Sequence, residues 1–176
     1  MRELILGGAR SGKSRHAQTR ALALSMAKRA PVLCVVTAQA LDADMAERIA
    51  HHQAERPPAW QVVEAPFDLP WAIAAAPADA VVLVDCLTLW LSNCLCTAPD
   101  ALAARTDALL AAVQSRQGDL LLVSNEVGFG VVPEHALGRR FRDEAGRLHQ
   151  RLGEVCERVS LVVAGFATPL KSMEPA

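Results

Sequence analysis

The chain has 176 residues, 52% of them hydrophobic, and its formal net charge is -1. This length suits one domain spanning residues 1–176, and the apolar fraction is ample for a core, which excludes a disordered chain. Acids and bases are almost balanced, whereas proteins that bind duplex nucleic acid usually carry a strong basic excess. We therefore expect no nucleic-acid partner.

The five cysteines are odd in number and form no CxxC pair. This pattern predicts neither a disulfide framework nor a zinc site, and reduced thiols buried in a cytoplasmic protein fit it better. No signal peptide is visible, because the first apolar run, residues 4–6, ends at a glycine loop. The most apolar stretch, residues 81–96, contains Asp85, Ser92 and Asn93 and is too short and too polar for membrane insertion.

Short apolar runs alternate along the chain with longer stretches rich in Ala and Leu. The short runs predict strands at residues 4–6, 32–36, 81–84, 120–123 and 159–163, the last of these being the final strand. The longer stretches predict helices at residues 14–30, 43–55, 87–113 with a break near Pro99, and 134–155. Continuous apolar runs are typical of buried parallel strands covered by helices on both faces. The sequence therefore predicts an α/β fold with a mostly parallel, doubly wound sheet flanked by helices.

Polar or glycine residues follow each predicted strand at its carboxyl end. In doubly wound sheets, ligands bind outside the carboxyl ends of the strands. We therefore expect one site to assemble from residues far apart in the sequence, namely Gly7, Thr37, Asp85, the group Ser124, Asn125 and Glu126, and Gly165.

The first of these strand ends carries a phosphate-binding motif. Residues 7–14 match G-x-x-x-x-G-K-[ST], and they lie between a predicted strand and a predicted helix, as the motif requires. Backbone N–H groups of this P-loop would surround the phosphates of a purine nucleoside triphosphate, and the following helix directs its positive end at the same anion. Lys13 should reach the β- and γ-phosphates, while the Ser14 hydroxyl should bind Mg²⁺. The predicted phosphate-binding residues are Gly7, Gly8, Ala9, Arg10, Ser11, Gly12, Lys13 and Ser14.

Two carboxylates at other strand ends are candidates for supporting roles. Asp85 closes the run at residues 81–84 and could hold Mg²⁺ directly or through water, although Asp is also a good helix N-cap. Glu126 could orient water, act as a base or cap its own loop.

A histidine pair occupies the predicted helix at residues 43–55. Met45, Ile49 and His52 share one face at spacings of four and three, whereas His51 is rotated away from it. From the residues alone, His52 is either a structural residue or a nucleophile or proton carrier beside the P-loop.

The position of the pair argues partly against a nucleophile. The helix C-terminus favours the imidazolium form, whereas a nucleophilic imidazole must be neutral. Burial or a neighbouring arginine, Arg48 or Arg56, would have to offset that effect.

Several blocks of sequence, taken in order over essentially the whole chain, resemble one enzyme family. The block HH-x-x-x-R-P at residues 51–57 and the block N-E-V-G-x-G-x-V-P at residues 125–133 are far more specific than the P-loop. The chain resembles adenosylcobinamide kinase/adenosylcobinamide-phosphate guanylyltransferase at residues 7–16 (GGARSGKSRH), 36–52 (VTAQALDADMAERIAHH), 56–60 (RPPAW), 84–93 (VDCLTLWLSN), 124–133 (SNEVGFGVVP) and 140–150.

The resemblance implies a bifunctional enzyme of cobalamin assembly with a three-layer, RecA-like P-loop fold. Such an enzyme phosphorylates the aminopropanol hydroxyl of adenosylcobinamide with ATP or GTP. It then transfers GMP from GTP to that phosphate, giving adenosylcobinamide-GDP and pyrophosphate. The corrinoid is thus the expected partner molecule and Mg²⁺ the expected cofactor. The resemblance also implies a homotrimer, and the apolar run at residues 87–95 could cover either a subunit interface or a core.

The resemblance assigns roles to individual residues. His52 matches the histidine that carries a covalent guanylyl group, and Lys13 is the second expected catalytic residue. At Asp85 the family often has glutamate, so the carboxylate would be shorter here. The helix that carries His52 must approach the α-phosphate, which suggests a movable segment near residues 56–58. The implied GTP contacts are the P-loop with Val35, Val36, Thr37, Gln53, Ala54, Glu55, Arg56, Glu64 and Asp85.

Two other functions are compatible with the P-loop. A plain small-molecule kinase would leave His52 structural and form no covalent nucleotide. A RecA-like ATPase or regulatory GTP-binding module would hydrolyse nucleotide without transfer to a corrinoid, but the sequence shows no finger arginine or partner-binding tail that supports it.

Overall fold

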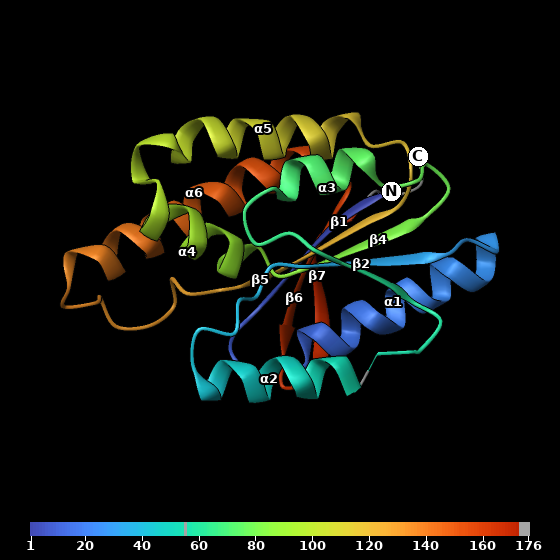
Figure 1. The fold of residues 1–176 in the computed structure, drawn as a ribbon, viewed down its shortest axis with the longest axis horizontal. Helices are drawn as coiled ribbons and strands as arrows, with labels where there is room; N and C mark the ends of the chain where they lie inside the picture. The colour runs from blue at the N-terminus through green and yellow to red at the C-terminus, as the bar shows by residue number, and fades with distance from the viewer. Residues whose placement is uncertain (55, 173–176) are drawn as a thin grey trace.

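A computed structural model describes residues 1–54 and 56–172 of the chain. Its strands join in one seven-stranded sheet of order β3-β2-β4-β5-β1-β6-β7 (Figure 1). The strands are β1 (Arg2–Gly7), β2 (Val32–Val36), β3 (Gln61–Glu64), β4 (Val81–Asp85), β5 (Leu120–Asn125), β6 (Arg158–Val163) and β7 (Phe166–Lys171). The helices are α1 (Lys13–Lys28), α2 (Ala43–Ala54), α3 (Leu69–Ala75), α4 (Leu87–Thr97), the 3-10 helix η1 (Pro99–Ala101), α5 (Leu102–Ser115) and α6 (Ala136–Val155).

Neighbouring strands from β3 to β6 run parallel, and β7 pairs antiparallel with β6. The central strands β4, β5 and β1 are buried along most of their length, which explains their continuous apolar sequences. The mostly parallel sheet flanked by helices is therefore confirmed. The predicted break near Pro99 falls where η1 separates α4 from α5.

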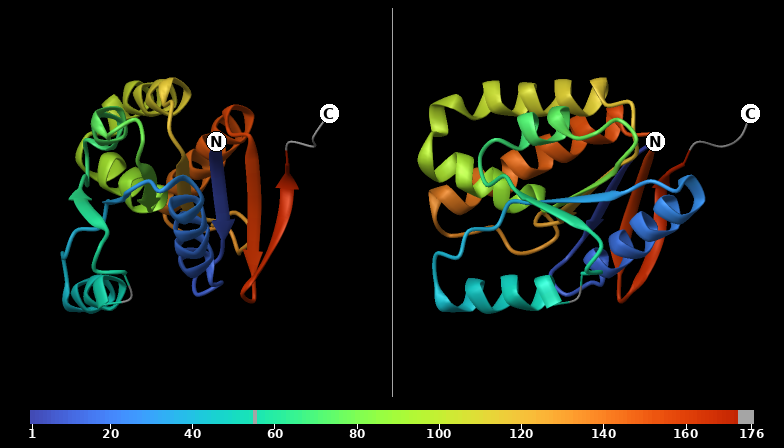
Figure 2. Two further views of the ribbon diagram at one scale, coloured as in Figure 1. Left: turned by 90° about the vertical axis from the view of Figure 1, so that its right-hand side faces the viewer. Right: turned by 45° about the vertical axis from the view of Figure 1, so that its right-hand side comes forward.

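The helices divide unequally between the two faces of the sheet. Successive strand residues face opposite sides, so Leu4 and Ile5 belong to separate core clusters. On one face Ala17 and Ala21 of α1 pack against the sheet, while α3, α4, α5 and α6 cover the other face (Figure 2). Within that second cluster the indole N–H of the fully buried Trp90 donates to the carbonyl oxygen of Phe67 at 2.9 Å. The sheet is thus the middle of three layers.

Most of the apolar run at residues 87–95 belongs to the core. It forms most of α4, and Leu87, Trp90 and Leu91 are each at most 1% exposed. Among the described residues, no helix combines the length and apolar character needed to cross a bilayer.

The prediction that the strand at residues 159–163 is the last one is wrong, because β7 follows it in antiparallel pairing. All residues of β7 are exposed and one is Pro169, so the segment lacks the apolar run that marks a buried strand. Proline is tolerated in such an edge strand because a ladder hydrogen bond is not needed on the open side. The four-residue edge strand β3 and the seven-residue helix α3 were not predicted either.

Helix α2 lies beyond the carboxyl ends of the parallel strands, opposite the start of α1 (Figures 1 and 2). None of its residues is fully buried, so α2 adds little to the core. This placement leaves an opening between α2 and the loop that joins β1 to α1.

Candidate active site

The P-loop connects β1 to α1 and is held by hydrogen bonds near both of its ends. The backbone N–H of Glu126 donates to the carbonyl oxygen of Gly7 at 3.0 Å. The backbone N–H of Gly165 donates to the carbonyl oxygen of Ser11 at 2.8 Å. These bonds attach the loop to the end of β5 and to the turn between β6 and β7, so the cradle is already shaped without a ligand.

Glycine is required at the point where the loop enters α1. Gly12 precedes the helix with φ of 92°, a left-handed conformation that a side chain disfavours. A Cβ atom placed there would lie 3.1 Å from the Cα of Gly165. The second glycine of the motif therefore permits both the backbone turn and the close approach of the β6–β7 turn.

A cleft of about 970 Å³ opens between the P-loop and α2. Its wall on the α2 side carries charged and imidazole groups, which face the backbone N–H donors at the start of α1. The lining residues are Ala9, Arg10, Ser11, Gly12, Lys13, Ser14, Arg15, Asp44, Glu47, Arg48, His51, His52, Asn125, Ala164 and Gly165. The volume and the basic lining suit a nucleoside triphosphate.

Lys13 stands at the floor of this cleft in a partly buried position. Its Nζ donates to the carbonyl oxygen of Gly8 at 3.1 Å. Burial lowers the pKa of Lys13, Asp85 opposes that effect, and Arg48 on the far wall adds to it. The ammonium therefore interacts electrostatically with α2 as well as with the end of β4, and a phosphate chain between the walls would relieve the repulsion between the two cations.

Hydroxyl groups join the ends of the strands beneath the cleft. The Thr37 hydroxyl donates to the carbonyl oxygen of Cys86 at 2.7 Å and accepts from the Cys86 N–H at 3.0 Å. Its side chain therefore connects β2 to the residue after β4. The Thr88 hydroxyl in turn receives the side-chain amide of Asn125 at 2.8 Å, linking α4 to the end of β5.

Ser124, His149 and Glu126 form a chain of polar contacts behind the P-loop. The Ser124 Oγ and His149 Nε2 are 2.7 Å apart, and His149 Nδ1 lies 3.7 Å from Glu126 Oε2. Burial lowers the pKa of His149, and Glu126 partly offsets this, so the ring is predominantly neutral at pH 7. Glu126 Oε1 also accepts the backbone N–H of Gly128 at 2.6 Å. Of the roles open to Glu126, these contacts favour capping of its own loop.

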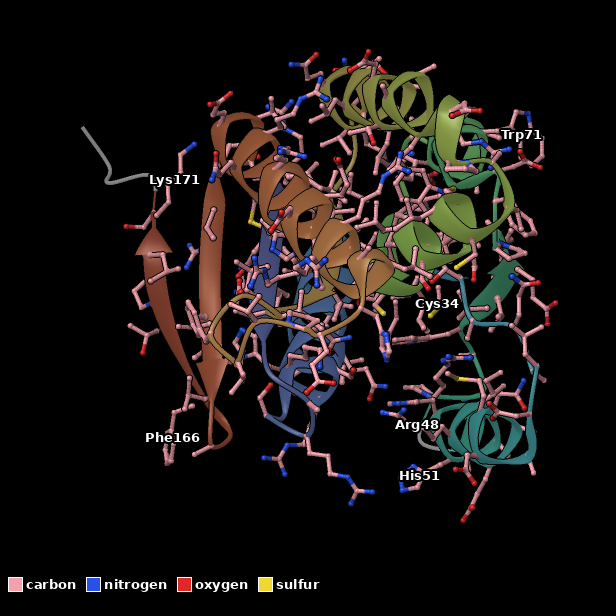
Figure 3. The ribbon with its side chains drawn as sticks, turned by 90° about the vertical axis from the view of Figure 1, so that its left-hand side faces the viewer. Cys34, Arg48, His51, Trp71, Phe166 and Lys171 are labelled. Atoms are coloured by element: carbon pink, nitrogen blue, oxygen red, sulfur yellow. The ribbon has the colours of Figure 1, made fainter. Side chains whose placement is uncertain are left out.

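The two adjacent histidines both border the cleft but differ in exposure. Met45, Ile49 and His52 are the half-buried residues of α2, as their helical spacing predicts, whereas His51 is exposed. The ring centroids of His51 and His52 are 6.1 Å apart with planes inclined by 58°. Arg48 and His51 both extend from α2 toward the side where α1 begins (Figure 3). The sequence placed His51 away from the face of His52, toward either solvent or the GTP base, and His51 is exposed but borders this cleft.

Comparison with known proteins identifies the family. A family model described as cobinamide kinase / cobinamide phosphate guanyltransferase matches residues 3–170. The chain belongs to this family.

Full-length relatives agree with the family match. The chain is 50% identical over 173 residues to the bifunctional adenosylcobalamin biosynthesis protein CobP of Pseudomonas aeruginosa, covering 97% of this chain and 98% of the relative. It is 40% identical over 185 residues to the bifunctional adenosylcobalamin biosynthesis protein CobU of Salmonella typhimurium, covering 96% and 98%. A protein of the same name from Escherichia coli is 40% identical over 183 residues, again covering 96% and 98%.

Membership of the cobinamide kinase / cobinamide phosphate guanyltransferase family decides between the functions that the P-loop left open. The protein is an enzyme of two transfers, a kinase acting on cobinamide and a guanyltransferase acting on cobinamide phosphate. Both transfers consume a nucleotide, which agrees with a P-loop that lines the cleft. A regulatory module that only hydrolyses nucleotide does not fit this family.

The structure brings some of the residues predicted to bind nucleotide into the cleft and leaves others outside it. Val35 is fully buried in the core, and Glu64 borders a separate hollow of about 150 Å³ that also contains Trp71. Glu55 lies outside the described residues. The predicted residues that line the cleft are Ala9, Arg10, Ser11, Gly12, Lys13, Ser14 and His52. Those that are described but do not line it are Gly7, Gly8, Val35, Val36, Thr37, Gln53, Ala54, Arg56, Glu64 and Asp85.

Sequence reasoning did not place several residues of the α2 wall in the cleft, although it named Arg48 as a possible neighbour of the imidazole. Asp44 and Arg48 precede His52 by eight and four positions, so helical spacing could have placed them on the same side of α2. Asn125 was noted as a residue at a strand end, but no role was derived for it. Ala164 carries no chemical signal, and its position follows from the tight turn between β6 and β7.

Proposed function

We propose that one cleft performs both transfers and that the second passes through a guanylyl group on His52. In the first transfer, ATP or GTP phosphorylates the aminopropanol hydroxyl of adenosylcobinamide. In the second, GMP from GTP is transferred to that phosphate, giving adenosylcobinamide-GDP and pyrophosphate. The observation that carries this proposal is the placement of the P-loop and the His51–His52 pair on opposite walls of the same cleft.

A shared cleft is consistent with the chemistry of the two steps. Kinase transfer attacks the γ-phosphorus and guanylyl transfer attacks the α-phosphorus of a triphosphate held by the same loop. Lys13 and the N–H groups at the start of α1 neutralise phosphate charge in both transition states. The sequence contains one P-loop motif, which supports a single triphosphate site.

The guanylyl step divides into two displacements with His52 between them. The neutral imidazole attacks the α-phosphorus, a P–N bond forms, and the bond from that phosphorus to the bridging oxygen breaks as pyrophosphate leaves. A phosphate oxygen of the cobinamide phosphate then attacks the same phosphorus, and the P–N bond breaks to restore the imidazole. The half-buried position of His52 with Met45 and Ile49 supports its choice over the exposed His51.

Ser14 and Asp85 have the oxygen atoms that Mg²⁺ prefers. The first is the second residue of α1 and lines the cleft, and the second ends β4, where its charge opposes the lowering of the Lys13 pKa by burial. This donor set fits a metal that would neutralise charge on the triphosphate, with the Ser14 hydroxyl and the Asp85 carboxylate holding it. The protein's own groups, among them Lys13 and the N–H groups at the start of α1, bind and orient the reacting groups.

Self-association as a homotrimer is also part of the proposal. Large apolar side chains that are more than half exposed support it, since soluble monomers rarely leave such groups together. They occur after β5 and on the β6–β7 edge, at Phe129, Val131, Val132, Leu137, Val163, Phe166 and Leu170. Light scattering at micromolar concentration should give the mass of a trimer, and a monomer mass would contradict it. The five free cysteines support a reducing compartment, the cytoplasm.

Labelled GTP tests the covalent step. The protein is incubated with Mg²⁺ and GTP labelled at either the α- or the γ-phosphate, without corrinoid. The α-label should stay on the denatured protein, resist alkali and be released by acid, because a phosphoramidate is acid-labile. The γ-label should not be retained, and cobinamide phosphate should discharge the α-label. A protein that never retains the α-label would contradict the covalent route and would fit direct transfer of GMP to the cobinamide phosphate, with a structural His52.

A further inference from the structure

Asn125 is a polar residue of the cleft to which the two transfers described above give no role. It is the last residue of β5, in register with Gly7 at the end of β1. On its other side β5 pairs with β4, which ends at Asp85. Asn125 therefore stands between the start of the P-loop and the strand that carries the candidate metal ligand, and it lines the cleft itself.

The orientation of the Asn125 amide is set by Thr88, the second residue of α4. The Asn125 Nδ2 donates to the Thr88 Oγ1 at 2.8 Å, and the Asn125 backbone N–H approaches the same oxygen at 3.4 Å. The Thr88 Oγ1 lies 3.2 Å from the Cys86 Sγ, and because the oxygen already accepts from the two Asn125 N–H groups, its own proton is left to donate to the sulfur. Thr88 is only 4% exposed, and this small network is shielded from water. The network holds the Asn125 Nδ2 against Thr88 and so fixes the orientation of the amide.

The consequence is that the remaining polar atom of the amide, Oδ1, is left for a ligand. Within residues 1–54 and 56–172, no hydrogen bond reaches Asn125 Oδ1. An amide oxygen accepts hydrogen bonds and does not donate them. It therefore suits a hydroxyl group and is poorly suited to a phosphate oxygen, which at neutral pH is an acceptor as well.

The two transfers of this enzyme differ in this respect. The acceptor of the kinase step is an alcohol, which has a proton to donate. The acceptor of the guanylyl step is a phosphate monoester, which is anionic at neutral pH. A fixed amide oxygen near the phosphates thus discriminates between the acceptors of the two steps.

We propose that Asn125 is a catalytic residue of the kinase step and that Thr88 is its positioning residue. The Asn125 Oδ1 accepts a hydrogen bond from the acceptor hydroxyl and so aims an oxygen lone pair at the γ-phosphorus. A bond forms between that oxygen and phosphorus, the bond to the β–γ bridging oxygen breaks, and its electron pair leaves on the nucleoside diphosphate. The hydroxyl proton passes to a phosphate oxygen, because an amide is too weak a base to keep it.

The experiment compares the two half-reactions in the same protein preparations. Kinase turnover is measured with cobinamide and ATP, and covalent nucleotide formation is measured with α-labelled GTP without corrinoid. Asn125→Ala should lower the kcat of phosphorylation by about 100-fold, the usual effect of losing a well-placed orienting group, with little change in the KM for ATP. The rate of α-label retention should change by less than about threefold, because that step uses no hydroxyl acceptor.

Variants of Thr88 separate positioning from general damage to the fold. Thr88→Val removes the hydroxyl at nearly constant volume and should lower the kinase kcat by about tenfold, whereas Thr88→Ser should recover most of the loss. Thr97→Val is the matched control, since Thr97 is an exposed residue of the same helix whose hydroxyl bonds to the Asn93 carbonyl at 2.7 Å. Thermal unfolding of each variant checks that the fold is intact.

The outcomes are distinct. A kinase kcat that is lowered in Asn125→Ala and Thr88→Val, with α-label retention preserved, supports the assignment. An unchanged kinase kcat in Asn125→Ala, or equal losses in both half-reactions, overturns it. The inference rests on the kinase activity and not on the guanylyl-histidine. If the wild-type protein retains no α-label, the covalent route fails while the kinase comparison still decides the role of Asn125.

Discussion

The rings of His51 and His52 lie side by side on α2, with centroids 6.1 Å apart and planes inclined by 58°, and both border the phosphate-binding cleft. Their surroundings differ, since His52 shares the half-buried face of Met45 and Ile49 and His51 is exposed. A nucleophile held against packed neighbours loses less conformational freedom on reaction than one in solvent. Helix α2 therefore presents two imidazoles to one cleft, and it holds the ring of His52 more rigidly than the ring of His51.

Lys13→Ala should abolish both transfers while preserving the fold. The Lys13 Nζ makes one hydrogen bond within the described protein, to the Gly8 carbonyl at 3.1 Å, so its loss costs little stability. Losing a charge that meets developing phosphate charge should lower both rates by at least about 100-fold. Circular dichroism and paired kinase and guanyltransferase assays check this. Near-normal guanyltransferase activity in the variant would contradict a shared cleft.

Asp85→Asn should weaken the dependence on Mg²⁺ more than the binding of nucleotide without metal. Replacing the carboxylate at the end of β4 by an amide removes a negative charge from a candidate metal ligand. The midpoint of the Mg²⁺ titration of activity should rise by about tenfold. A titration curve that matches the wild type would assign Asp85 a structural role at the end of β4, since the N-cap of α4 is Cys86.

Gly12→Ala and Gly8→Ala form a matched pair within the P-loop. At Gly12 a methyl group would meet Gly165 at 3.1 Å in a left-handed conformation, whereas at Gly8 no atom lies within 4 Å of the added Cβ. Gly12→Ala should destabilise the protein by at least about 1–2 kcal/mol. In a protein of this size, each kcal/mol of lost stability lowers the Tm by about 2–4 °C. Calorimetry showing equal Tm values for the two variants would contradict the loop geometry.

His149 should make the protein less stable in mild acid. Burial lowers its pKa below the ordinary value of 6.5, so the folded protein keeps the ring neutral while the unfolded chain takes up a proton. The contribution is fully present above about pH 6.5 and is lost progressively as the pH falls through the lowered pKa.

His149→Gln tests this pH dependence. The variant should be less stable at pH 8 by about 1–3 kcal/mol, because the contacts to Ser124 and Glu126 are disturbed. Its free energy of unfolding should also fall less steeply below pH 6.5 than that of the wild type. Urea unfolding at a series of pH values measures both effects. Parallel profiles for the two proteins would show that His149 does not carry the pH dependence.

The sequence predicted the buried part of the fold because burial leaves a local signature. Strands β1, β2, β4, β5 and β6 each contain a short, mostly apolar run, and the P-loop follows the first of them. The edge strand β7 has no such signature, because its exposed residues are held by pairing with β6. Its existence depends on a partner strand and not on its own hydrophobicity.

The candidate site was predictable where one element carries the signal. The P-loop and the shared face of Met45, Ile49 and His52 follow from local spacing. The contact between Ser124 and His149 joins residues 25 positions apart on different elements, so no periodicity reveals it. The same holds for the contact of Gly165 with Ser11, which depends on the turn after β6 reaching the P-loop.

The most direct test of the central claim is the location of the covalent nucleotide. The protein is incubated with GTP and Mg²⁺, kept alkaline, digested and analysed by mass spectrometry. We predict GMP on His52 in the wild type and in His51→Ala. We predict no adduct and no guanyltransferase activity in His52→Ala, which should keep much of its kinase activity because the γ-phosphoryl group goes directly to the hydroxyl. GMP located on His51 or on Lys13 would contradict the account.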